Sequence, residues 1–193
     1  MKASAEGILY PKDAKPSLLM TFHASLDLLN SCTLSSLDSK TIEIPHAAWS
    51  KCKDELDMAF ERVAGAKASH IFVLGPLHNG PITPESSDAV YAPSDGSLKG
   101  SDWEIMLCVP ESLKRFVTFS DDICSEEHSL ELAAPYLSLL FPKVPVCHLL
   151  ASGMCENVKK IAFEVKNSFP NAIVFISNNR ETCCAGMWKE AFC

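Results

Sequence analysis

The sequence has no long hydrophobic run, no basic run and no low-complexity tract. No apolar stretch approaches the ~20 residues needed to cross a bilayer, and the first residues lack the uninterrupted apolar core of a signal peptide. The formal net charge is −7, whereas the phosphate contacts of nucleic-acid binding need a basic surface. These absences predict a cytoplasmic protein that has neither a membrane nor a nucleic acid as its partner.

Paired-cysteine motifs are also missing, although cysteine itself is abundant. The chain has 9 cysteines, and none of them is spaced as a CxxC zinc or redox motif. Because no secretion signal precedes them, we expect most to be reduced thiols, buried as small apolar residues. The adjacent pair Cys183 and Cys184 is kept open as an exception.

What the sequence does have is an alternation of short apolar runs and amphipathic stretches. Extended segments are expected at 41–44, 69–74, 144–150 and 171–176, with helices at about 50–64, 125–141 and 156–168. The alternation predicts an α/β fold in which helices cover both faces of a predominantly parallel sheet. At 193 residues, we expect a single domain spanning 1–193.

Two further local predictions follow from cap and turn residues. Ser101 stands three positions before Glu104, which fits a capping box, and we predict a helix from Ser101 to about Cys108. Residues 177–184 are polar and follow the last clear strand, so they are predicted to form a loop.

Two histidines follow the first two predicted strands. Pro45 and His46 end the first run, and Gly75-Pro76 ends the second just before His78. In open α/β sheets, ligands bind outside the carboxyl ends of the strands. If the two strands are neighbours, both imidazoles reach one site, and imidazole is a ligand for zinc, copper and iron. Each histidine alone is better explained as a structural or exposed residue, and only the pair at equivalent positions raises the case for a shared site.

A second polar cluster, Glu127 and His128, stands at the start of the predicted helix 125–141. A carboxylate in a first helical turn is favoured by the helix dipole, so charge complementarity explains it without a function. The functional alternative is that Glu127 or His128 donates or accepts a proton at the site, or orients a ligand there.

Three ordered motifs resemble the Memo family, whose bacterial and archaeal members are called AmmeMemoRadiSam system protein B. The matching segments are Pro45-His46-Ala47, Leu74-Gly75-Pro76-Leu77-His78 and Glu126-Glu127-His128-Ser129-Leu130-Glu131. The resemblance implies a fold like that of the class III extradiol dioxygenases (LigB-like). It also implies one bound redox-active transition metal, iron or copper, with His46 and His78 as ligands, while the chemistry of imidazole leaves zinc open as a third choice.

The chain departs from the family pattern in its last part. Asn179 and Thr182 stand where the family has an aspartate and a histidine, and the family's C-terminal third has no counterpart in this sequence. The resemblance therefore implies a shortened, degenerate member with an incomplete metal centre. Glu181, Cys183 and Cys184 belong to the same segment, and they are the candidates for replacement ligands.

Two functions follow from these residues. In the first, the protein binds a transition metal at a degenerate site, with enzymatic activity doubtful. In the second, it is a scaffold module that binds a peptide or small molecule without metal and without catalysis. An exposed sheet edge would in addition allow a homo-oligomer to form.

Overall fold

The computed structural model describes residues 41–47, 49–77, 89–100, 103–127, 129–151, 156–178 and 183–192. The protein is a mixed α/β structure built around one 8-stranded sheet. Its strands are β1 (Thr41–Pro45), β2 (Ile71–Pro76), β3 (Val90–Ala92), β4 (Gly96–Lys99), β5 (Glu104–Leu107), β6 (Thr118–Phe119), β7 (Val146–Ala151) and β8 (Ile173–Asn178). Its helices are α2 (Trp49–Glu61), the 3₁₀ helix η1 (Glu111–Phe116), α3 (Asp121–Ser125), α4 (Ser129–Leu140), α5 (Glu156–Ser168) and α6 (Cys183–Phe192).

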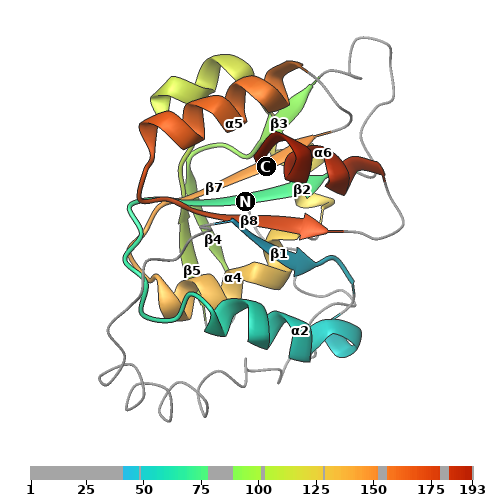
Figure 1. Cartoon of the computed structure of the whole chain (residues 1–193), viewed down its shortest axis with the longest axis vertical. Coiled ribbons are helices and arrows are strands. Elements are labelled where there is room, and N and C mark those ends of the chain that lie inside the picture. The colour runs from blue at the N-terminus through green and yellow to red at the C-terminus, as the bar shows by residue number, and fades with distance from the viewer. Residues whose placement is uncertain are drawn as a thin grey trace.

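The sheet is predominantly parallel, as the alternation predicts. The strand order is β1-β8-β2-β7-β3-β6, and β5 adds to β7 with β4 beside it. Only the β3–β7 and β4–β5 pairings are antiparallel among the described strands. Helices α2 and α4 lie on one side of the sheet and α5 lies on the other (Figure 1). The prediction of an α/β fold with helices on both faces is confirmed.

Strands β1 and β2 are not neighbours, which corrects the expectation for the two histidine-bearing strands. Strand β8 lies between them and pairs in parallel with both. The reason is visible in the burial of each strand. Residues Ile173–Ser177 of β8 are all buried, as a central strand requires, whereas β1 alternates between buried and more exposed positions, as an edge strand does.

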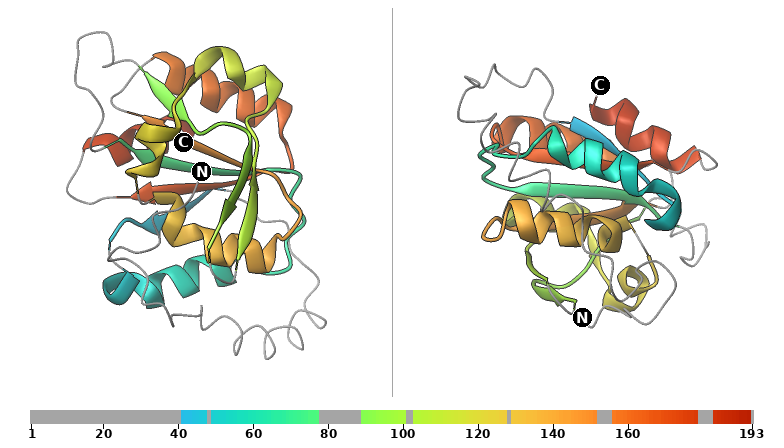
Figure 2. Two further views of the ribbon diagram at one scale, coloured as in Figure 1. Left: turned by 180° about the vertical axis from the view of Figure 1, so that it is seen from behind. Right: turned by 90° about the horizontal axis from the view of Figure 1, so that it is seen from below.

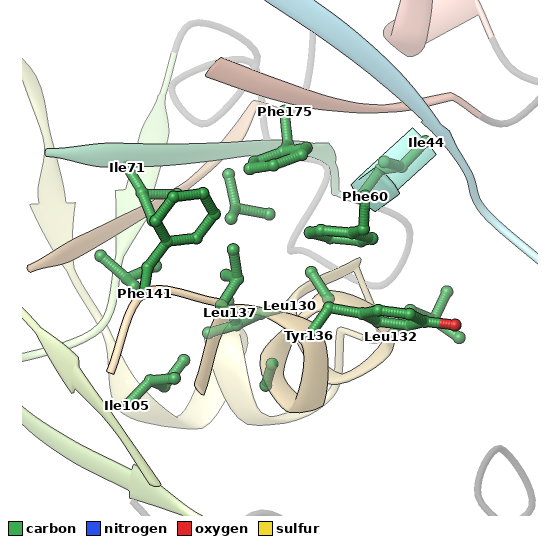
Figure 3. Packing of buried hydrophobic residues seen from close by; sticks show 14 of the residues in the cluster. Ile44, Phe60, Ile71, Ile105, Leu130, Leu132, Tyr136, Leu137, Phe141 and Phe175 are labelled. Atoms are coloured by element: carbon green, nitrogen blue, oxygen red, sulfur yellow. The ribbon is translucent and has the colours of Figure 1, made fainter. Parts of the chain in front are cut away.

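The face covered by α2 and α4 carries a stacked aromatic core. The Phe60 ring lies between those of Tyr136 and Phe175, with ring centroids 4.4 and 4.7 Å apart respectively (Figure 3). The Tyr136 hydroxyl donates a hydrogen bond of 2.5 Å to Asp57, which also pairs with Lys53 at 2.6 Å. Burial, followed by the Asp57 carboxylate, raises the pKa of Tyr136 far above its usual range.

The segment predicted as a helix from Ser101 to Cys108 is wrong over its described part. Residues Glu104–Leu107 form β5, paired antiparallel with β4 (Figure 2). Ile105 and Leu107 are buried and the residues beside them are exposed, which is the period of two of a half-buried strand. The inward residues pack in the same core cluster as α4. The capping-box spacing was therefore outweighed by the alternation.

The polar loop predicted for 177–184 is also wrong at both of its ends. Strand β8 continues through Ser177 to Asn178, and helix α6 begins at Cys183. Trp188 and Met187 of α6 are buried against the α5 side of the sheet. This buried face explains why the segment is helical, because amphipathic packing stabilises a short helix more than its composition does.

Candidate functional site

His46 lies where the sequence predicts it, just beyond the carboxyl end of β1. Its backbone N–H still donates to the Asn178 carbonyl at 3.0 Å, so β1 and β8 stay paired up to this residue. Its ring Nδ1 is hydrogen-bonded to the Ser177 hydroxyl at 2.8 Å. Ser177 is fully buried and His46 is half-buried. The hydroxyl fixes the orientation of the ring, and coordination by this ring would then use Nε2.

A second imidazole, His148 of β7, lies on the same face of the sheet. It is 1% exposed, and its Nε2 is hydrogen-bonded at 2.9 Å to the hydroxyl of Ser129, the first residue of α4. Burial lowers the pKa of His148 to about 3, and the charge of His46 adds to the effect. The His148 ring is therefore neutral at pH 7 and within electrostatic range of His46.

The other ring nitrogen of His148 is unusual. Nδ1 is buried and has no hydrogen-bond partner within the described part of the chain. An unpaired buried polar atom costs about 1–3 kcal/mol, so such a group calls for an explanation other than stability.

Ser129 lies directly over the backbone of β2. A Cβ added to Gly75 would lie 2.5 Å from the Ser129 Oγ and 2.8 Å from its Cβ. Only glycine fits at this position, because α4 begins in contact with the end of β2. The Gly75-Pro76 sequence, read as a turn signal, thus also permits close helix-to-strand packing.

Glu127 is the described member of the second predicted cluster. Its side chain is 3% exposed, and the residue stands two positions before Ser129 at the start of α4. Charge complementarity in a first helical turn does not describe it, because α4 begins at Ser129 and the Glu127 side chain is buried. The structure therefore brings Glu127 to the same end of α4 as the His148–Ser129 pair.

The remaining predicted site residues are not described to the same extent. His78, His128 and Glu181 lie outside the described residues. Cys183 and Cys184 form the first two positions of α6, and only their backbone is described. Strand β2 ends at Pro76. The next residue, Leu77, still lies along β7, because its N–H donates to the Ala151 carbonyl at 2.9 Å.

Sequence reasoning missed His148 and Ser129 as site residues. His148 stands inside the apolar run Val146–Ala151 of a strand with every residue buried. The signal that was available is the residue type: an ionisable side chain in a central strand must be neutral and hydrogen-bonded. Its partner Ser129, 19 residues earlier in the chain, stands inside the motif Glu126–Glu131, but nothing in that motif marks the contact with His148.

The fit of this arrangement to a transition metal rests on its donor chemistry. His46 is a half-buried imidazole with a fixed ring, which suits zinc, copper or iron. No group of three or more His, Cys, Asp or Glu side chains that would hold a metal is present among the residues with described positions. His46 is thus the ligand candidate with a described side chain, because His78 and Glu181 lie outside the described residues and only the backbone of Cys183 and Cys184 is described.

The comparisons with known proteins add no relative: no family model matches the chain, and no curated protein matches it either. No helix among the described residues is both long and apolar enough to span a membrane.

Proposed function

We propose that this chain is a Memo-like protein that binds one transition-metal ion, iron, copper or zinc, at the carboxyl end of its sheet. The supporting observation is the His46 ring, which is held by Ser177 at the end of β1. His78 follows the described end of β2 by two residues, and β8 alone separates the two strands. A LigB-like dioxygenase fold is part of the proposal and is consistent with the mixed sheet.

The residues proposed to hold the ion are His46 and His78, with Glu181, Cys183 and Cys184 as candidates to complete the coordination. A bound ion of this kind supplies Lewis acidity or redox chemistry to a small molecule. Ser177 keeps the His46 ring in one orientation, and the neutral His148 adds no positive charge beside the site. Glu127 and His128 are the candidates for proton transfer or for orienting a ligand. Because Asn179 and Thr182 replace the family's aspartate and histidine, the proposal assigns binding without turnover.

The experiment is a metal titration of the protein purified under reducing conditions. We expect the wild type to bind one equivalent of Zn²⁺ or Cu²⁺ and the His46→Ala/His78→Ala variant to bind none, as measured by mass spectrometry and calorimetry. His70→Ala is the matched control, because His70 is a half-exposed histidine beside the amino end of β2, where its ring packs on Phe169 at 4.7 Å. Equal, near-zero metal in all three proteins would refute the proposal.

A second function has its own supporting observation. Two hydroxyls, those of Ser129 and Ser177, accompany two imidazoles on the same side of the sheet within an apolar core. Hydroxyl and imidazole groups among apolar residues are typical of ligand sites, so a scaffold that binds a small molecule or peptide without metal is the alternative. A ligand bound equally by the wild type and the double histidine variant would favour it.

A further inference from the structure

The pair formed by His148 and Ser129 has a buried position that stability does not explain. Both side chains are at most 1% exposed, and each has apolar neighbours in its own element. Burying an imidazole and a hydroxyl is costly even when they bind each other, and His148 Nδ1 has no partner within the described residues. A nucleophilic serine is not a reasonable role either, since an external substrate cannot reach Ser129.

The contact of Ser129 with Gly75 gives the pair a geometric role. Ser129 Oγ occupies the space next to Gly75 that a side chain would otherwise fill. In β7, Leu150 is the register partner of Gly75, and His148 stands two residues before it. The Nε2 of His148 is the hydrogen-bond partner of the Ser129 hydroxyl and so determines where that hydroxyl lies. The start of α4 is thereby fixed against the end of β2 on the α2 and α4 side of the sheet.

Trp188 holds the same glycine from another direction. Its indole Nε1–H donates to the Gly75 carbonyl at 3.2 Å, and the ring is fully buried among the side chains of the α5 side. Pairing between β2 and β8 ends at Leu74, whereas pairing between β2 and β7 continues to Pro76. The indole therefore binds the backbone at the point where β2 leaves one of its two neighbouring strands.

We propose that His148, Ser129 and Trp188 form a clamp on Gly75 and act as positioning residues for the end of β2 and the start of α4. The clamp fixes the direction in which the chain leaves β2 toward His78, three residues after Gly75. It also fixes the start of α4, which follows Glu127 and His128. This proposal rests on the proposed function in one respect, because it takes the bound metal to be the group that the end of β2 and the start of α4 position. The clamp itself is a property of the metal-free protein.

The first test uses the metal-free protein, so it does not depend on metal binding. The reporter is the amide of Leu77, which donates to the Ala151 carbonyl just beyond the clamp. In His148→Leu and Trp188→Phe we expect hydrogen exchange of this amide to accelerate at least roughly 10-fold, while exchange at the α5 amides stays unchanged. His148→Gln is the conservative variant, because its amide can still bond to Ser129, and exchange should return toward the wild-type rate. His70→Leu, beside the other end of β2, is the control and should leave Leu77 unaffected.

The second test measures Co²⁺ affinity and the electronic spectrum of the bound ion in the same variants. We expect affinity to fall roughly 10- to 100-fold with an altered spectrum in His148→Leu and Trp188→Phe, and to recover in His148→Gln. Unchanged exchange at Leu77 in both disruptive variants would overturn the clamp. Altered exchange with unchanged Co²⁺ affinity and spectrum would overturn its role at the site. A wild type that binds no Co²⁺, together with altered exchange, would refute the proposed metal site and leave the clamp standing.

Discussion

The two faces of the sheet bury different kinds of side chain. The face under α5 and α6 is apolar, with Phe72, Leu74, Val174 and Ile176 in one cluster with Trp188. The face under α2 and α4 carries Ser177 and His148 on its strands and is met there by Ser129 of α4. The comparison separates two roles, because apolar burial stabilises the fold whereas these buried polar groups cost stability.

The largest expected effect is the pH dependence that His148 contributes, because its pKa is lowered furthest among the described histidines. Its pKa is lowered to about 3 in the folded protein, so the unfolded chain binds a proton at this residue first as the pH falls. Stability is therefore full above pH ~6.5 and decreases between about pH 6.5 and 3, by roughly 5 kcal/mol at most. Urea unfolding of the wild type and His148→Leu across this range measures the effect. If the two proteins lose stability in parallel, His148 is not the cause.

The next effect is expected on the apolar face. Phe72 is fully buried, with its ring 5.5 Å from that of Phe169, and Phe72→Ala should lower the free energy of unfolding by about 4 kcal/mol. His148→Leu, equally buried, should change it by less than about 1 kcal/mol at pH 7, because the lost hydrogen bond is offset by removal of an unpaired nitrogen. Urea titrations at pH 7 compare the two. Equal losses would mean that both faces serve stability alike.

The fold was largely predictable because its signals are local. The amphipathic pattern of α5 gave both of its bounds, and the apolar run of β7 was found with small errors at its ends. The insertion of β8 between β1 and β2 was not predictable, because it depends on pairing between segments about 130 residues apart, as in the bond between His46 and Ser177. Segment β5 shows a second limit of prediction. There the capping-box spacing favours a helix, the alternation of apolar and polar residues favours a strand, and tertiary packing decides between them.

The candidate site was predictable only where a motif marks the end of a strand. Pro45-His46 is such a motif, and the structure brings this histidine beside Ser177 as a ring of fixed orientation. His148 has no such mark, since a lone histidine in a strand has the same appearance whether or not it contacts a helix. The closeness of Ser129 to Gly75 likewise follows from how α4 packs on β2, which composition does not encode.

Gly75→Ala tests how tightly the polar face is built. The added methyl group would meet Ser129 at 2.5–2.8 Å, and Ser129 is held by His148, so it cannot rotate away without losing its hydrogen bond. We expect a loss of about 2 kcal/mol in the free energy of unfolding, within the usual range for overpacking. Thermal and urea unfolding measure the loss. In a Ser129→Gly background the cost of the same substitution should be smaller, and an undiminished cost would place the strain elsewhere.

The smallest effect is expected where β1 meets α6 at the surface. Lys189 of α6 pairs with Glu43 of β1 at 2.6 Å, and Asn178 donates to the same carboxylate at 2.8 Å. The hydrogen bond from Lys189 lowers the pKa of Glu43, so Lys189→Ala should raise it toward its ordinary value, as carboxyl NMR titration will measure. Stability should change by less than about 1 kcal/mol, because both side chains are exposed and solvent screens the pair. A larger loss would mean that the attachment of α6 to the sheet depends on this ion pair rather than on the burial of Trp188. In that case the apolar face would owe part of its stability to charge, and the contrast between the two faces would be weaker.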